Sequence, residues 1–285
     1  MADSGKQDMP PGDEGPLNSP KKEDGSRRRK PWFGKLLFVG LALSLIVSLL
    51  GNLALYRQMR EYYERAGDAR TDLAGEDAFA ADNAALGDPD PNVVRMVIAG
   101  DSDVEHWDPL PEVEGCEIVA RGLGGDRTGD LLLRLQRDVI DLKPAVAVVT
   151  IGGNDLEDLA VLPDREDALV TICERNIRVI VDRLRQQRIQ VVLLTILPYG
   201  DLDATEALTW SNATYGAVER VNAMIRTLGG PGVTVVDCDP ILARPNGHRK
   251  PAYSEEMIHL NTAGYEALNE ALLPVLEAAA KRAKP

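Results

Sequence analysis

The chain has 285 residues, of which 44% are hydrophobic, so it can form a folded core and is not disordered throughout. Its formal net charge of −13 at pH 7 argues against general electrostatic binding of nucleic acid. The cysteines, Cys116, Cys173 and Cys238, lie in apolar stretches without a CxxC motif or a Cys/His cluster, so no zinc site is indicated. We expect buried thiols, with one disulfide as the alternative.

The N-terminal part of the chain is predicted to be a tail followed by a membrane span. Residues 1–35 are rich in Pro, Gly, Ser and charge, and are interpreted as a disordered cytoplasmic tail. Residues 36–55, LLFVGLALSLIVSLLGNLAL, carry no charge and are long enough to cross about 30 Å of hydrocarbon. A buried core helix is the alternative, but the apolar character on all sides and the basic flank favour a span.

This span is predicted to be a signal anchor rather than a cleaved signal peptide. The apolar run is longer than a usual signal-peptide core, and the following YRQMREYYERA offers no obvious small-x-small cleavage site. Basic residues are more frequent before the span than after it, including the run Arg27–Lys30. The positive-inside rule therefore predicts a cytoplasmic N-terminus and a periplasmic or extracellular domain after Tyr56.

The remaining chain divides into a connecting segment and a folded domain. Residues 56–92 are predicted to form a juxtamembrane helix and then a linker rich in Ala, Asp and Gly. Residues 93–283 are predicted to form one domain, in which apolar runs of four to eight residues alternate with amphipathic helical stretches. This alternation favours an α/β fold with a parallel sheet covered by helices on both faces.

Candidate functional residues follow the predicted strands. Ser102 lies in GDS after the first strand, Gly125 in GLGGD after the second, and Asn154 in GGND after the third. His259 lies in IHLN just before the last helix. Because functional loops of such sheets lie at the carboxyl ends of the strands, we expect these four residues in one crevice.

The four residue types together suit nucleophilic catalysis. A serine hydroxyl needs a base to remove its proton, histidine is the usual base, and backbone N–H groups and an Asn amide can bind the oxyanion. Singly, each motif also has a structural reading, because GDS can cap a helix and GGND can form a turn. No P-loop, GxSxG elbow or complete dinucleotide fingerprint is present in the sequence.

The order GDS, GGD, GGND and a late histidine resembles the SGNH hydrolases, also called GDSL esterases/lipases. The resemblance implies a flavodoxin-like three-layer α/β/α sandwich with a five-stranded parallel sheet, here preceded by one transmembrane helix. It implies Ser102 as nucleophile, His259 as base, and an oxyanion hole formed by Ser102 N–H, Gly125 and Asn154. It implies no metal or organic cofactor.

Two positions depart from the family pattern. The carboxylate expected three residues before the histidine is Glu256 rather than Asp; we interpret Glu256 as the acid that orients His259, with Glu255 or a backbone carbonyl as alternatives. Asp103 adds a carboxylate directly after the nucleophile, and we expect it at the amino end of the next helix, where negative charge is favoured. His106 and His248 are weaker candidates for the base.

The predicted function is that of a membrane-anchored serine esterase acting on a short-chain or O-acetyl ester of a small molecule or glycan. Alternatives are an acyl transferase, a thioesterase or lysophospholipase, and a non-catalytic module that binds an acylated glycan.

Overall fold

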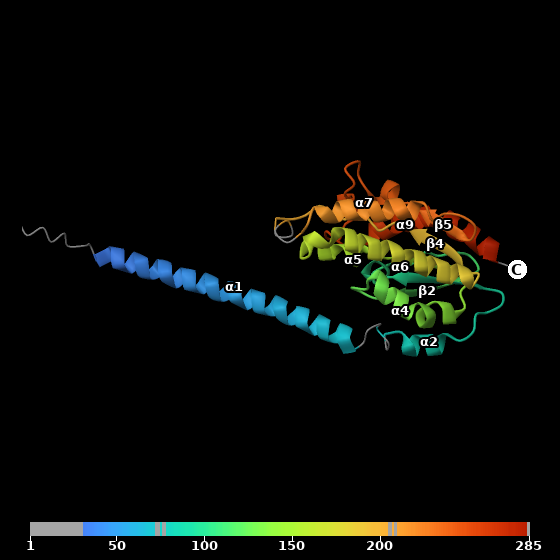
Figure 1. The fold of residues 1–285 in the computed structure, drawn as a ribbon, viewed down its shortest axis with the longest axis horizontal. Helices are drawn as coiled ribbons and strands as arrows, with labels where there is room; N and C mark the ends of the chain where they lie inside the picture. Colours follow the sequence, from blue (N-terminus) through green and yellow to red (C-terminus); the bar gives the residue numbers. More distant parts are fainter. Residues whose placement is uncertain (1–30, 72–74, 76–77, 205–206, 208–209, 284–285) are drawn as a thin grey trace, which may run out of the picture. The chain divides into compact units, whose positions relative to one another are not determined.

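The computed structural model describes residues 31–71, 75, 78–204, 207 and 210–283, so most of the predicted tail lies outside the described residues. Two compact units are present, residues 1–62 and 63–285. The long helix α1 (Pro31–Thr71) contains the predicted span, and most of it lies in the first unit (Figure 1). Its stretch Lys35–Arg60 is long and apolar enough to cross a membrane, and none of it is buried.

The second unit is built on a parallel sheet. In the part of the chain that the structure describes, five strands pair in the order β2-β1-β3-β4-β5, and every pairing is parallel. This order is the flavodoxin-like one, in which the direction of strand addition switches between β1 and β3. The predicted fold class is therefore confirmed. The strands are β1 (Val94–Gly100), β2 (Cys116–Gly122), β3 (Val146–Thr150), β4 (Gln190–Leu194) and β5 (Val233–Val236).

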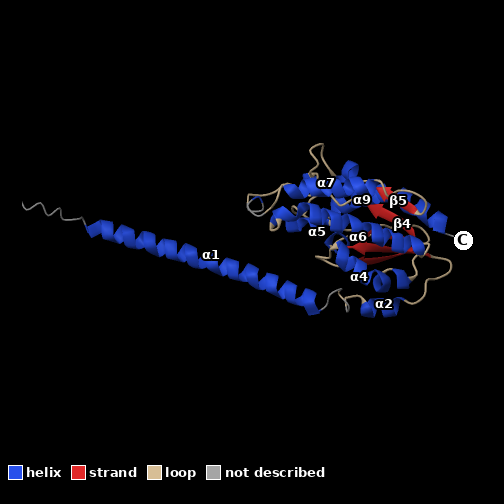
Figure 2. Ribbon diagram, viewed as in Figure 1, coloured by secondary structure: helices blue, strands red, loops and turns tan. Residues whose placement is uncertain are grey.

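Helices cover both faces of this sheet (Figure 2). Successive side chains of a strand point to opposite faces, so Val97 of β1 packs in one apolar cluster and Ile98 in the other. The first cluster includes residues of α4 (Thr128–Asp138), α6 (Glu166–Gln186) and α7 (Ala213–Arg226), and the second includes residues of α9 (Thr262–Ala283). The shorter helices are α2 (Ala80–Leu86), α3 (Ser102–Glu105), α5 (Gly153–Glu157) and α8 (Asp239–Leu242), with 3₁₀ turns at Ile140–Leu142, Asp158–Ala160, Pro163–Arg165 and Pro251–Tyr253.

The segment predicted as a juxtamembrane helix and linker contains regular structure. Helix α1 continues to Thr71, and α2 lies within the stretch predicted as a linker. Leu86 of α2 packs against the first apolar cluster, and Asn83 donates a hydrogen bond to Asp138. Helix α2 therefore belongs to the second compact unit. Cys173 and Cys238 are buried, as expected, whereas Cys116 is only partly buried.

Candidate active site

The serine lies where β1 ends. Asp101 caps the short helix α3 by accepting a hydrogen bond from Asp103 N–H, and Ser102 is the first residue of that helix. The N–H groups of a first helical turn have no partner within the helix, which leaves the Ser102 N–H available to a ligand. At Gly100 a Cβ would lie 2.2 Å from the Thr150 carbonyl oxygen, so only glycine permits this close packing of β1 on β3.

Ser102, His259 and Glu256 form a hydrogen-bonded series. The Ser102 hydroxyl lies 3.0 Å from His259 Nε2, and His259 Nδ1 lies 2.5 Å from Glu256 Oε1. The serine and histidine are 157 positions apart in the sequence, and the loop before α9 brings them together at the carboxyl end of β1. This geometry suits proton transfer from the hydroxyl to the ring and stabilisation of the resulting imidazolium by the carboxylate.

The Glu256 carboxylate is fixed by its own loop. It accepts hydrogen bonds from the N–H groups of Ile258 (2.7 Å) and His259 (2.8 Å). Partial burial acts to raise the pKa of Glu256, but these two N–H groups and the His259 ring outweigh it and lower the pKa below its usual value. Glu256 therefore carries the negative charge that a cationic imidazole requires beside it.

A buried arginine supports the loop that carries Glu256 and His259. Arg249 is fully buried, and its guanidinium donates to the carbonyl oxygens of Glu256, Met257 and Ile258 at 2.7–3.0 Å. Its Nε donates to the Ser254 hydroxyl. A planar group with five donors can satisfy several carbonyls at once, so Arg249 sets the path of this loop.

The predicted oxyanion donors lie on two neighbouring loops that are linked through Asp126. Gly125 has φ +83°, a conformation that favours glycine, and no backbone carbonyl of the described residues accepts its N–H. Asn154, at the start of α5, donates one amide hydrogen to the Asp126 carbonyl at 3.0 Å. The second amide hydrogen of Asn154 is free to serve a ligand in the cleft, which Asn154 lines together with Ser102.

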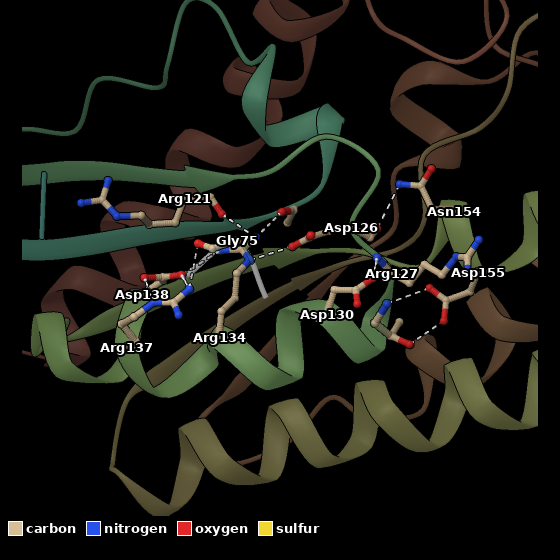
Figure 3. A network of polar contacts seen from close by, with 12 residues as sticks. Gly75, Arg121, Asp126, Arg127, Asp130, Arg134, Arg137, Asp138, Asn154 and Asp155 are labelled. Atoms are coloured by element: carbon tan, nitrogen blue, oxygen red, sulfur yellow. Dashed lines mark hydrogen bonds and ion pairs between the residues drawn. The ribbon is translucent and has the colours of Figure 1, made fainter. Parts of the chain in front are cut away.

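A second contact joins the same two loops (Figure 3). The buried Asp155 carboxylate accepts a hydrogen bond from Thr128 N–H at 2.8 Å and another from the Thr128 hydroxyl at 2.6 Å. We call residues 123–127, between β2 and α4, the glycine loop. Asp155 thus caps α4, which begins directly after this loop. Burial raises the pKa of Asp155, and the two bonds from Thr128 oppose that rise.

The cleft beside Ser102 is narrow and partly acidic. Its lining comprises Asp101, Ser102, Asp103, Gly153, Asn154, Glu157, Ile196, Leu197, Tyr199 and Ile258. Its whole volume is ≈ 280 Å³, and its enclosed part holds only about one water-sized group. Tyr199 donates a hydrogen bond to Glu157, whose pKa is raised by burial.

Asp103 occupies this cleft as well as the first turn of α3, where it was expected. Its Oδ1 is buried and has no hydrogen-bond partner among the described residues. Burial raises the pKa of Asp103 to about 7, against an opposing effect of Arg249 and with a further rise due to Glu157 and Glu256. Asp103 therefore lines the cleft together with Ser102.

The weaker histidine candidates, His106 and His248, are not part of the hydrogen-bonded series Ser102–His259–Glu256. His106 packs edge-on against the His259 ring with centroids 4.8 Å apart, so it flanks the proposed base. His248 stacks on Tyr215 and pairs with Asp201. Within the described residues, no group of three or more His, Cys, Asp or Glu is arranged to hold a metal ion.

Sequence reasoning missed the buried Arg134 and Arg249 and the half-buried Glu157. A signal existed for Arg134, because it lies on α4 between Leu131 and Leu135, on the face that packs on the sheet. Arg249 and Glu157 gave no such signal. The contacts of Arg249 with the carbonyls of residues 256–258, and of Glu157 with Tyr199, form only when the loops fold together.

A parallel α/β sheet that brings a serine, an imidazole and a carboxylate into one hydrogen-bonded series defines the class of serine hydrolases. The sequence pattern of the GDSL-like lipase/acylhydrolase family matches residues 99–267, and the chain belongs to this family. The predicted family and the predicted enzyme class, a carboxylic ester hydrolase, are thereby confirmed.

Solved structures agree with the family assignment. The chain is 25% identical to an acylhydrolase-type protein from Bacteroides fragilis, with a TM-score of 0.57 over 74% of this chain and 99% of that one. It is 22% identical to a GDSL-like lipase from Bacteroides thetaiotaomicron, with a TM-score of 0.57 over 74% and 100% of the two chains, a likeness of fold alone. No curated protein matches the chain.

Proposed function

We propose that the protein is a membrane-anchored serine esterase that removes short acyl groups, O-acetyl above all, from esters of small molecules or glycans outside the cytoplasm. The observation that carries the proposal is the series Ser102–His259–Glu256 beside the narrow cleft.

The mechanism begins with proton transfer from Ser102 to His259 Nε2. The serine oxygen attacks the ester carbonyl, while Glu256 stabilises the imidazolium. The oxyanion is held by the N–H groups of Ser102 and Gly125 and by the Asn154 amide. His259 then gives its proton to the leaving alkoxide, and an acyl-enzyme remains. Water, deprotonated by His259, attacks this acyl group and releases the acid and the free serine.

The size of the cleft supports a short acyl group. Its enclosed part accommodates a group the size of a methyl, with Ile196, Leu197 and Ile258 as apolar contacts. A long alkyl chain would require an extended apolar channel. The cleft is instead lined in part by the acidic groups Asp103 and Glu157, beside which an alkyl chain is unfavourable.

An open groove next to Glu256 suits the alcohol part of the substrate. It has a volume of ≈ 620 Å³ and is lined by Asp201, Asp203, Pro251, Ser254, Glu256 and Met257. Carboxylates accept hydrogen bonds from hydroxyl groups and repel anions. This lining favours a neutral polyol such as a glycan over a phosphate-bearing alcohol.

Membrane attachment is inferred from the apolar helix. Large apolar side chains are exposed all along it, including Leu37 (67%), Phe38 (74%) and Val47 (68%). In water such a surface would be strongly unfavourable, while a bilayer would cover it. The basic residues before the span favour a cytoplasmic N-terminus, with the hydrolase unit on the other side.

The test compares acyl groups in the full chain solubilised in detergent micelles. Acetate release from acetylated oligosaccharides is measured beside cleavage of p-nitrophenyl acetate and p-nitrophenyl octanoate. We expect turnover of both acetyl esters and at least about tenfold lower kcat/KM for octanoate, corresponding to about 1.4 kcal/mol. Preference for octanoate, or activity retained in Ser102→Ala, would contradict the proposal.

A further inference from the structure

Residues between α1 and β1 contact the glycine loop and the helix α4 that follows it. We call Gly75 and residues 78–86 the strap. The Gly75 carbonyl accepts a hydrogen bond from Arg137, and a Cβ on Gly75 would lie only 2.5 Å from Leu123 Cδ2, within the glycine loop. The family match begins only at residue 99, so the strap lies outside it.

Phe79 and Asn83 of the strap cover two buried arginines. The Phe79 ring lies 4.9 Å from the Arg121 guanidinium carbon and 5.7 Å from that of Arg134, within the range of cation–π attraction. Asn83 accepts a hydrogen bond from Arg121 Nε and donates one to the buried Asp138 carboxylate. Arg121 is 6% exposed, and Arg134 and Asp138 are 0% exposed.

Arg134 connects the strap to the active site (Figure 3). Its Nε donates to the Asp126 carboxylate at 2.6 Å, and its Nη2 donates to the Gly100 carbonyl at 2.8 Å and the Arg121 carbonyl at 3.1 Å. Gly100 ends β1 two residues before Ser102. One guanidinium therefore holds the ends of β1 and β2 and the glycine loop together.

Asp126 is the residue through which both proposed oxyanion donors are placed. It follows Gly125 directly, and its carbonyl accepts the Asn154 amide hydrogen. The Arg134–Asp126 ion pair therefore holds the residue that adjoins one proposed donor and binds the other.

We propose that the strap is a positioning element of the active site, which holds the Arg134–Asp126 pair in the geometry that directs Gly125 N–H and the Asn154 amide at the oxyanion. By excluding water from the guanidinium groups, Phe79 strengthens the pair and limits its movement. The hydrolase unit then includes the strap, and a fragment that begins at residue 90 lacks a part of its active-site scaffold. The inference rests on the serine-esterase mechanism proposed above.

The test measures catalysis and oxyanion binding in Phe79→Ala and Asn83→Ala variants of the full chain in detergent micelles. Leu228→Ala is the matched control, because Leu228 is also partly buried against the first apolar cluster but lies outside the strap. The readouts are kcat and KM for p-nitrophenyl acetate, Ki for a trifluoromethyl ketone that forms a tetrahedral adduct with serine, and Tm. Phe79→Trp tests whether another aromatic ring restores function.

For Phe79→Ala we expect kcat to fall about tenfold, less than the 10²–10³-fold loss of a whole oxyanion donor, while KM changes less than twofold. The ketone Ki should rise by the same factor, and Phe79→Trp should recover most of kcat. Leu228→Ala should lower Tm without changing kcat.

If Phe79→Ala and Asn83→Ala lower Tm but keep the wild-type kcat and Ki, the strap only stabilises the fold and the inference is overturned. If Phe79→Ala is unfolded at the assay temperature, Asn83→Ala decides by the same criteria. Wild-type protein that neither cleaves p-nitrophenyl acetate nor binds the ketone would instead overturn the proposed esterase mechanism.

Discussion

Replacing Asp103 by asparagine is expected to stabilise the protein above pH 7 and to leave its stability unchanged below about pH 4. Burial raises the pKa of Asp103 from 3.8 to about 7 in the folded state. The folded protein therefore holds this proton more tightly than the unfolded chain does. The resulting cost of ionisation is absent below pH 3.8, grows between 3.8 and about 7, and is constant above that range.

The magnitude follows from the size of the pKa difference. One pKa unit corresponds to 1.36 kcal/mol, so the rise from 3.8 to about 7 sets an upper limit of about 4 kcal/mol for the gain in Asp103→Asn. The asparagine keeps the shape of the protonated side chain but carries no charge. It also removes a negative neighbour that raises the pKa of the buried Asp101.

The assay is thermal unfolding of the full chain, followed by near-ultraviolet circular dichroism at pH 4, 6, 7 and 8.5. For a folded unit of this size each kcal/mol shifts Tm by about 2–4 °C, so a gain of several degrees is expected at pH 8.5. Asp182→Asn, which removes an exposed carboxylate on α6, is the control and should change Tm little at any pH. A lower Tm for Asp103→Asn at pH 8.5, or an equal gain at pH 4, would refute the reasoning.

Three further predictions concern the catalytic loops. Glu256→Gln should lower kcat by about 10²–10⁴-fold with little change in KM, because an amide does not stabilise the imidazolium. Glu256→Asp should retain more activity, and steady-state kinetics with p-nitrophenyl acetate measure both variants. Asn154→Ala should lower kcat by about 10²–10³-fold with KM nearly unchanged, and a change confined to KM would exclude it from the oxyanion hole. Arg249→Met should lower the free energy of unfolding by at least about 2 kcal/mol, because three loop carbonyls lose their donor, and denaturant titration measures this.

The fold could be predicted from the sequence because its signals are local. Apolar runs such as 94–100 read as buried strands, and the amphipathic pattern of 166–186 reads as a helix with one face on the sheet. The residues at the strand ends could be named for the same reason, since a parallel sheet collects its carboxyl-terminal loops at one edge.

The supporting residues could not be predicted, because the local sequence does not show which contacts they make in the folded chain. Arg249 reads as a solvated charge in a polar loop, yet it is fully buried under the carbonyls of residues 256–258. Residues 80–86 are rich in alanine and carry little apolar periodicity, so α2 was interpreted as linker. What fixes α2 is its contact with Arg121 and Asp138, which the local sequence does not reveal.

The central claim, that the Ser102 hydroxyl is activated by His259, is tested most directly by a fluorophosphonate probe on the full chain in detergent micelles, followed by mass spectrometry of the labelled peptides. The account predicts one adduct, on Ser102, that is absent from Ser102→Ala and forms far more slowly in His259→Ala. No adduct on the wild-type protein, or equal labelling of the Ser102→Ala variant, would contradict it.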